Sequence, residues 1–297
     1  MFSVLWSGRP LLYGCIRGLA SLPYPVPPME DRILLAASTF CFLLGFAYTM
    51  FVLGTGRYQP SRFSFGTMAC GFAFQTGFLV ERGHALNACP LTNLFEVLIF
   101  LSWSMVLLYF VVGTTYRLSL LGVFTSPLAF TFQAFALIAP LDSPPGPRAR
   151  VVAQPWLETH AAVSIIAYGA FALACVAGVM YLIQERQLKT HRLRGLFFHL
   201  PPIADLAVAI NRLIRTGFIL LTIGLLSGFA VGGEWSKVEW SKVIWGVGVW
   251  LIYGGILKAE KWRQVTPRRV AQLSVAAFSI TLATLWGLNF INPTVSL

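Results

Sequence analysis

Eight long apolar stretches divide this sequence, and short polar loops separate them. Each stretch approaches the roughly 20 residues that a helix needs to cross a hydrocarbon core of about 30 Å. No soluble domain interrupts the series, so the pattern predicts an all-α fold: a polytopic membrane helix bundle with about eight transmembrane helices. The predicted spans are residues 33–54, 64–80, 92–113, 118–139, 159–184, 214–233, 242–258 and 269–292.

The composition supports this prediction. Charged residues make up 11% of the 297 residues and apolar residues 57%, with a mean hydropathy of +0.72. A soluble domain carries about 25% charged residues. The net charge is +11, but the basic residues lie in short loops between apolar runs. Membrane orientation explains such loops better than RNA or DNA binding does, so we expect no nucleic-acid partner.

The basic residues are distributed unequally between the two sides of the predicted bundle. Of the 22 Lys and Arg residues, 14 lie on the side that holds loops 185–213 and 258–268, and 8 lie on the other. Cytoplasmic loops carry the excess of Lys and Arg. We therefore expect a multi-pass plasma (inner) membrane protein with both termini outside, in the periplasm, and the basic loops in the cytoplasm. Within the first loop, residues 203–214 have helical apolar spacing, which predicts an interfacial amphipathic helix leading into the sixth span.

The N-terminal segment, residues 1–31, has no apolar run long enough to cross a membrane. The stretch MEDRILLAASTF, which begins at Met29, would make a compact start for the first span. We therefore hypothesise that Met29 is the true initiator and that residues 32–297 form the membrane domain.

Nothing in the sequence indicates conventional catalysis. The chain has no Gly-rich phosphate loop, no HExxH motif and no nucleophile elbow. Its five cysteines include no CxxC pair, and Cys41, Cys70 and Cys175 lie inside apolar runs. This arrangement argues against a thiol relay and a structural zinc site. We expect a protein that is not an enzyme.

Four tryptophans recur every five residues in GGEWSKVEWSKVIWGVGVW, residues 232–250. They are Trp235, Trp240, Trp245 and Trp250. Five-residue spacing turns successive side chains on a helix by about 140°, so the four rings cannot form one stripe. Two interpretations remain open: an aromatic belt at the membrane interface, or a surface for a flat aromatic ligand.

Three further residues are candidates for function. His160 opens the fifth span on the outer side, and His84 lies in the outer loop after the second span. A neutral imidazole is a common metal ligand, although a histidine beside Thr159 is also an ordinary polar residue at a helix start. Glu96 is an acidic residue inside a span and hence a functional candidate. The run from Asn93 to Glu96 fits a helix N-cap with a capping-box glutamate equally well.

Three segments together carry a resemblance to a known family. The chain resembles the cytochrome c assembly family, the CcsA-like haem-handling membrane proteins, over roughly residues 33–292. Its compact length resembles the HemX-type branch in particular. The segments are RGHALNACPLTNLFEVLIFLSWSMVLLY (82–109), WLETHAAVSIIAYGAFALACVAGVMYLIQERQLK (156–189), and GFILLTIGLLSGFAVGGEW (217–235) followed by WLIYGG (250–255).

In that family an outer tryptophan-rich loop is thought to hold haem over the membrane, with histidines as iron ligands. The resemblance implies that Trp235, Trp240 and Trp245 contact the porphyrin, that His160 ligates the iron, and that His84 is a candidate second ligand. No Asp follows the tryptophans here, and His160 is the one family histidine that is plainly retained. One strong axial ligand implies haem bound at low occupancy.

The resemblance implies an integral membrane haem-handling protein that takes part in cytochrome c-type biogenesis. Its expected partners are haem, other cytochrome c assembly membrane proteins, apocytochrome c and the lipid bilayer. The alternative is a HemX-type membrane regulator of haem biosynthesis that does not deliver haem. A small-molecule permease is a third reading, although the sequence has no convincing inverted repeat.

Overall fold

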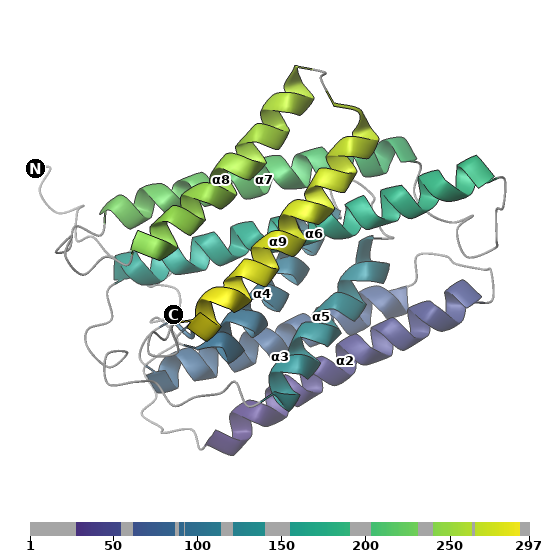
Figure 1. The fold of residues 1–297 in the computed structure, drawn as a ribbon. Helices are drawn as coiled ribbons and strands as arrows, with labels where there is room; N and C mark the ends of the chain where they lie inside the picture. Colours follow the sequence, from purple (N-terminus) through teal and green to yellow (C-terminus); the bar gives the residue numbers. More distant parts are fainter. Residues whose placement is uncertain are drawn as a thin grey trace, which may run out of the picture.

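The computed structural model describes residues 28–54, 62–86, 89–91, 93–113, 121–139, 155–190, 203–230, 240–262 and 265–291. Within these ranges the chain forms eight α-helices and no strand (Figure 1). A single π-helical turn, Tyr109–Gly113, extends α4. The predicted all-α bundle is therefore confirmed. The helices are α2 (Pro28–Gly54), α3 (Arg62–Leu86), α4 (Leu94–Leu108), α5 (Leu121–Ile138), α6 (Pro155–Thr190), α7 (Ile203–Ala230), α8 (Trp240–Lys261) and α9 (Pro267–Ile291).

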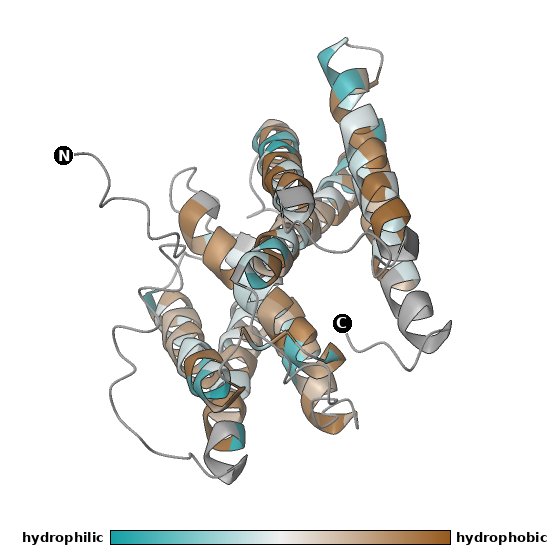
Figure 2. Cartoon of the chain, turned by 90° about the vertical axis from the view of Figure 1, so that its left-hand side faces the viewer, coloured by the Kyte–Doolittle hydropathy of each residue, from teal (hydrophilic) through white to brown (hydrophobic). Residues whose placement is uncertain are grey.

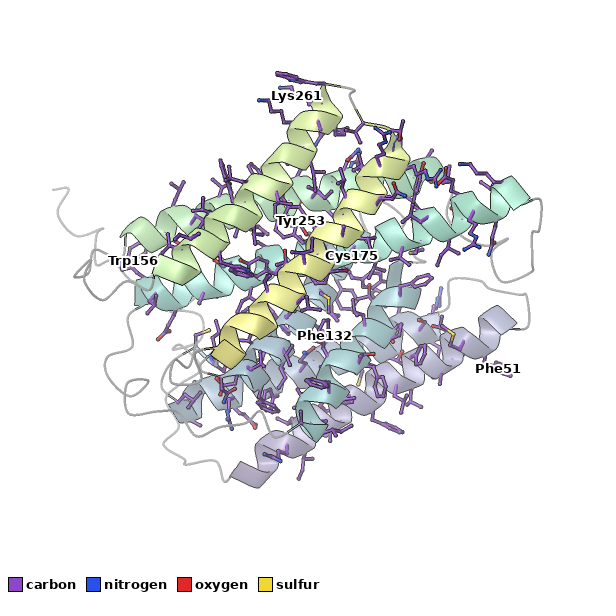
Figure 3. The ribbon with its side chains drawn as sticks, viewed as in Figure 1. Phe51, Phe132, Trp156, Cys175, Tyr253 and Lys261 are labelled. Carbon is purple, nitrogen blue, oxygen red and sulfur yellow. The ribbon has the colours of Figure 1, made fainter. Side chains whose placement is uncertain are left out.

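Six helices in the described part of the chain are long and apolar enough to cross a membrane. Apolar residues run along the lengths of the helices (Figure 2), and many large apolar side chains face outward, among them Phe51 and Ile244. Lipid rather than water suits such a surface. The protein is a multi-pass membrane protein. Trp156 at the start of α6 and Phe51 near the end of α2 mark opposite ends of the bundle (Figure 3).

Several helices extend further than the apolar runs predict. The second predicted span, 64–80, lies in a helix that continues to Leu86, and the fifth, 159–184, lies in one that continues to Thr190. The predicted interfacial helix at 203–214 is not separate, because α7 runs without a break from Ile203 to Ala230. Its apolar stripe, including Leu206, Ile210 and Leu213, is buried in the bundle core. That stripe faces other helices instead of a lipid surface.

The helices pack in two groups that share one pattern. In the first group α2 packs against α3 and α5, and α4 packs against α5; in the second, α6 packs against α7 and α9, and α8 packs against α9. Helix α4 also packs against α6 and so joins the groups, which lie one above the other in Figure 1. Nearly every residue of α4 is buried. It is the central helix of the bundle.

A repeated contact fastens the second and third helices of each group to each other. Trp103 Nε1 donates to Thr76 Oγ1 at 2.9 Å, and that hydroxyl donates to the Phe72 carbonyl at 2.7 Å. The Trp103 ring also stacks on Phe72, with centroids 5.6 Å apart. We call this arrangement the Phe–Thr–Trp clasp. It satisfies the indole N–H inside an apolar bundle, where an unpaired donor is costly.

The same clasp recurs in the second group. Trp250 Nε1 donates to Thr222 Oγ1 at 2.9 Å, Thr222 Oγ1 donates to the Phe218 carbonyl at 2.7 Å, and the Trp250 and Phe218 rings stack at 5.3 Å. A glycine precedes each clasp phenylalanine. Gly71 lies against the Phe42 ring of α2, and Gly217 lies against the Phe171 ring of α6. The glycines let neighbouring helices approach closely.

Buried polar side chains in the first group bond to one another. Thr39 Oγ1 donates to Gln133 Oε1 at 2.8 Å, and Gln133 Nε2 donates to Ser38 Oγ at 3.3 Å. Ser38 Oγ then donates to the carbonyl of Gly71 at 2.8 Å. These bonds join α2, α3 and α5 and satisfy groups that would otherwise be costly to bury in a membrane.

Candidate functional site

His160 lies in the first two turns of α6 and meets the last turns of α7. Its Nδ1 lies 2.6 Å from the carbonyl oxygen of Gly224, and its ring lies against Gly228. A carbonyl oxygen only accepts hydrogen bonds, so Nδ1 must carry the proton. In the neutral imidazole the lone pair then belongs to Nε2. Nε2 is the nitrogen left to bind iron or another metal.

Such a hydrogen bond is the usual environment of a histidine that ligates a metal. The second ring nitrogen of a metal-bound histidine almost always donates to a carboxylate, a backbone carbonyl or water. Among the described residues, no group of three or more His, Cys, Asp and Glu side chains could hold a bare metal ion. A single imidazole nevertheless suits iron in a porphyrin, because the macrocycle supplies four ligands of its own. The chemistry of this one imidazole is therefore that of an axial haem ligand.

The structure places the tryptophans on different neighbours. Trp245 Nε1 donates to Thr284 Oγ1 of α9 at 2.8 Å, and its ring lies 5.6 Å from that of Tyr168 in α6. Trp250 belongs to the clasp on α7. Trp240 begins α8, but its side chain, like all of Trp235, lies outside the described residues. The indole N–H groups of Trp245 and Trp250 are thus both bonded to threonine hydroxyls, and the Trp250 ring is stacked on Phe218.

His84 is not in a loop, where the sequence predicts it, because α3 continues past it to Leu86. Its side chain is exposed. Successive helices alternate in direction, so the end of α3 and the start of α6 lie at the same end of the bundle. The two histidines belong to different helix groups, however, and only His160 packs against α7.

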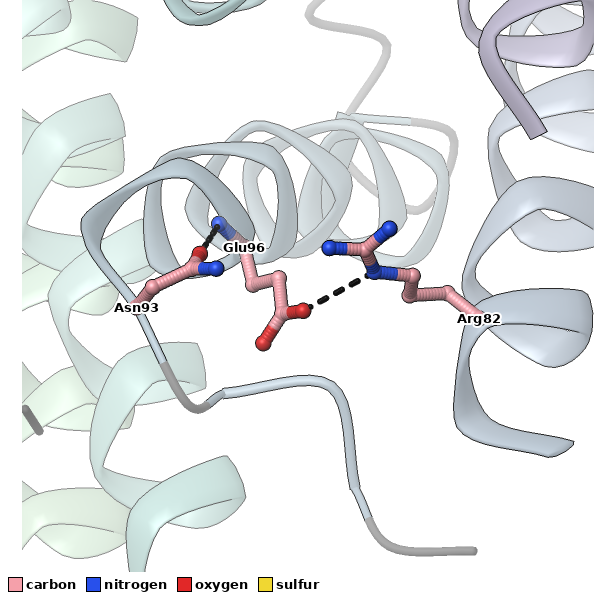
Figure 4. A network of polar contacts seen from close by, with 3 residues as sticks. All are labelled: Arg82, Asn93 and Glu96. Atoms are coloured by element: carbon pink, nitrogen blue, oxygen red, sulfur yellow. Dashed lines mark hydrogen bonds and ion pairs between the residues drawn. The ribbon is translucent and has the colours of Figure 1, made fainter. Parts of the chain in front are cut away.

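Glu96 lies in the first turn of α4, at the capped helix start that its sequence context predicts. Asn93 is the N-cap of α4, and its Oδ1 accepts from the Glu96 backbone N–H at 2.9 Å. The Glu96 side chain is fully buried, and its Oε1 accepts from Nε of Arg82 at 3.0 Å (Figure 4). The N-cap prediction is confirmed. Arg82 is the partner that sequence reasoning missed, because it comes from α3 and no local spacing links it to Glu96.

Cys89 lies between α3 and α4, beside this ion pair. Burial, together with the negative charges of Glu158 and Glu96, raises the pKa of its thiol to about 12. The thiolate is the reactive form of cysteine, so Cys89 stays protonated and unreactive near neutral pH. Its environment is the reverse of the electropositive one that activates a thiol.

Comparison with known proteins identifies the family. The model of the cytochrome C assembly protein family matches residues 91–296. The chain belongs to this family. The match includes α4 with Glu96, α6 with His160 and the tryptophans of α8, so all but the first two described helices fall within it. The chain is a membrane protein of cytochrome c biogenesis.

Curated relatives carry two different names. Protein HemX of Brevibacillus brevis is 29% identical over 174 residues, which cover 59% of this chain and 64% of that protein. The cytochrome c biogenesis protein CcsA of Gloeobacter violaceus is 25% identical over 318 aligned positions, covering 88% of this chain and 94% of that protein. CcsA of Chlorella vulgaris is 32% identical over 172 residues, and the match spans about half of its length, 52%.

Proposed function

We propose that this protein binds haem at the His160 end of the bundle and presents it for attachment to c-type cytochromes. Haem is the cargo, and the chain supplies its binding surface without making the covalent bond itself. The hydrogen bond from Nδ1 of His160 to the Gly224 carbonyl is the observation that carries the proposal. It leaves Nε2 free as the axial ligand of the iron.

The charges at the end of the bundle opposite His160 indicate which way the protein lies in the membrane. At the end opposite His160, Glu260 pairs with Arg215 at 3.1 Å and Glu185 pairs with Arg268 at 3.3 Å. Four described basic residues lie there in and after the last turn of α8 and at the start of α9: Lys258, Lys261, Arg268 and Arg269. A positive excess favours the cytoplasmic side. The His160 end then faces the outside, with both termini on that side.

We further propose how the site recognises its cargo. The faces of Trp240 and Trp245, at the start of α8, and Trp235 just before them would meet the flat porphyrin. His84 is the candidate for the second axial position. With one firmly held imidazole, we expect partial haem occupancy and a high-spin spectrum in the purified protein. Apocytochrome c and other assembly proteins of the membrane would approach from the same side.

The test is to compare haem content and cytochrome c maturation in matched variants. His160→Ala should remove the haem spectrum from the purified protein and stop haem attachment in a strain that depends on this gene. Gly248→Ala is the control, because a Cβ there meets nothing within 4 Å. His84→Ala reports whether a second histidine contributes. Wild-type protein that carries no haem after expression with excess precursor, or a normal spectrum in His160→Ala, would refute the proposal.

The alternative is a membrane regulator of haem biosynthesis that delivers no haem. Its basis is the resemblance to the HemX-type branch, and Protein HemX is among the relatives of this chain. Deletion of the gene separates the two. Loss of c-type cytochromes with normal haem precursors supports haem presentation, whereas altered precursor levels with normal c-type cytochromes support regulation.

A further inference from the structure

The imidazole of His160 lies directly over a glycine of the neighbouring helix. A Cβ added at Gly228 would lie 2.9 Å from both Cε1 and Nδ1 of the ring, closer than real Cβ contacts. Any side chain at this position would therefore push the ring away from α7. Nδ1 can approach the Gly224 carbonyl to 2.6 Å because Gly228, one turn further along α7, has no side chain.

The acceptor itself is fixed in place. The Gly224 carbonyl also accepts from Ser227 Oγ at 2.7 Å, within the same turn of α7. On the other helix, Ser164 Oγ donates to the His160 carbonyl at 2.7 Å. Backbone carbonyls do not rotate as side chains do, so the direction of the Nδ1–H bond is set by the positions of two helices. The direction of the Nε2 lone pair follows from it.

Gly228 is not one of the residues that the two helix groups share. Gly71 and Gly217 occupy the same place before the clasp phenylalanines, and each lies against an aromatic ring. The position equivalent to Gly228 in the first group lies ten residues after Phe72, as Gly228 lies ten residues after Phe218, and it is Arg82 of α3. Of the two equivalent positions, only the one in the group that holds His160 is a glycine.

We propose that Gly228 and the Gly224 carbonyl are positioning elements for His160, selecting the Nδ1–H tautomer and aiming Nε2 at the iron. The proposal rests on the proposed haem function for its consequence, but the tautomer and ring position are properties of the haem-free protein. Loss of such a hydrogen bond weakens metal binding by roughly 10- to 100-fold in characterised sites. We expect a loss of haem affinity of that order in Gly228→Ala.

The first experiment measures the tautomer without haem. Full-length protein is labelled with 15N-histidine in detergent, and the His160 signals among the four histidines are assigned by their loss in His160→Gln. Wild type should show a protonated Nδ1 and an unprotonated Nε2, and Gly228→Ala should show a mixture of tautomers. Gly71→Ala is the matched control, because its Cβ would lie 3.0 Å from the Phe42 ring, a comparable clash far from His160. A protonated Nε2 in wild type would overturn the proposal.

The second experiment does not depend on Gly228→Ala folding. His160→Gly leaves room for free imidazoles to ligate haem in its place. Imidazole and 4-methylimidazole retain an N–H for the Gly224 carbonyl, whereas 1-methylimidazole does not. We expect 1-methylimidazole to restore the haem spectrum roughly 10-fold less effectively than 4-methylimidazole, which carries the same added methyl group. Equal restoration by the two would show that the carbonyl bond does not position the ligand.

The outcomes distinguish this proposal from the proposed function. Haem that depends on His160 but is held equally well in wild type and Gly228→Ala would retain the function and reject the positioning role. A wild-type protein without haem would reject the function, and the 15N experiment would still decide whether α7 fixes the imidazole.

Discussion

Nε of Arg82 donates to Oε1 of Glu96 at 3.0 Å, and the Glu96 side chain has no exposed surface. The pair ties the last turns of α3 to the first turn of α4, the central helix. The guanidinium also lies over the Phe95 ring, 5.9 Å from its centroid. Breaking a buried ion pair is costly because the remaining charge loses its partner, while replacing both charges costs much less.

This pair predicts a specific order of stabilities. Glu96→Gln should be mild, because its amide oxygen can still accept from Arg82. Glu96→Leu should destabilise the protein by about 3 kcal/mol and lower its accumulation. Adding Arg82→Leu to Glu96→Leu should recover most of that loss. Thermal unfolding in detergent measures all three. Equal damage from Gln and Leu would instead indicate that the negative charge itself is required for stability.

Membrane orientation gives a second prediction. The excess of Lys and Arg at the end opposite His160 predicts that a reporter fused after Leu297 is active only if it works outside the cytoplasm. A fusion after Thr266, in the loop between α8 and α9, should behave in the opposite way. Cytoplasmic activity after Leu297 would place His160 on the wrong side for apocytochrome c.

Variants of Trp245 test whether this residue only anchors α8 to α9 or also contacts the ligand. Trp245→Phe keeps an aromatic ring but loses the bond to Thr284, and Thr284→Val loses the same bond from the other side. If the bond is the whole role of Trp245, each change should cost about 1 kcal/mol and the double variant no more. If the indole also contacts haem, Trp245→Phe should weaken the haem spectrum while Thr284→Val leaves it unchanged.

Cys89 should be unreactive although it lies in a loop. With its pKa raised to about 12, the thiolate fraction at pH 8 is at least roughly 100-fold below that of an ordinary cysteine. Alkylation of a variant with Cys89 as its one cysteine should therefore be slow and should still accelerate above pH 9. Glu158→Gln removes a negative charge, lowers the pKa and should speed the reaction. A rate that levels off near pH 9 would contradict the burial that we describe.

The fold was predictable because apolar length is a strong signal in membrane proteins. The ends of the helices were not, since α3 and α6 continue beyond the hydrocarbon-length runs through polar residues such as Arg82 and Glu185. His160 and Glu96 stood out as rare polar groups at the edges of apolar spans. Their partners did not stand out. Lipid-facing and core-facing sides of these helices are both apolar, so the sequence does not reveal how α7 is rotated to bring Gly224 and Gly228 to His160.

The clasp has a consequence for the ancestry of the chain. Gly-Phe-x-x-x-Thr occurs at 71–76 and again at 217–222, and the tryptophans that complete the two clasps follow their threonines by 27 and 28 residues. Two consecutive four-helix units with the same packing order are what duplication and fusion of one ancestral gene would leave. The corresponding helix ends of the two units differ: the first has Arg82 paired with the buried carboxylate of Glu96, and the second has Gly228 beneath the His160 ring. After such a duplication, one copy can keep the framework rigid while the other is free to acquire a ligand.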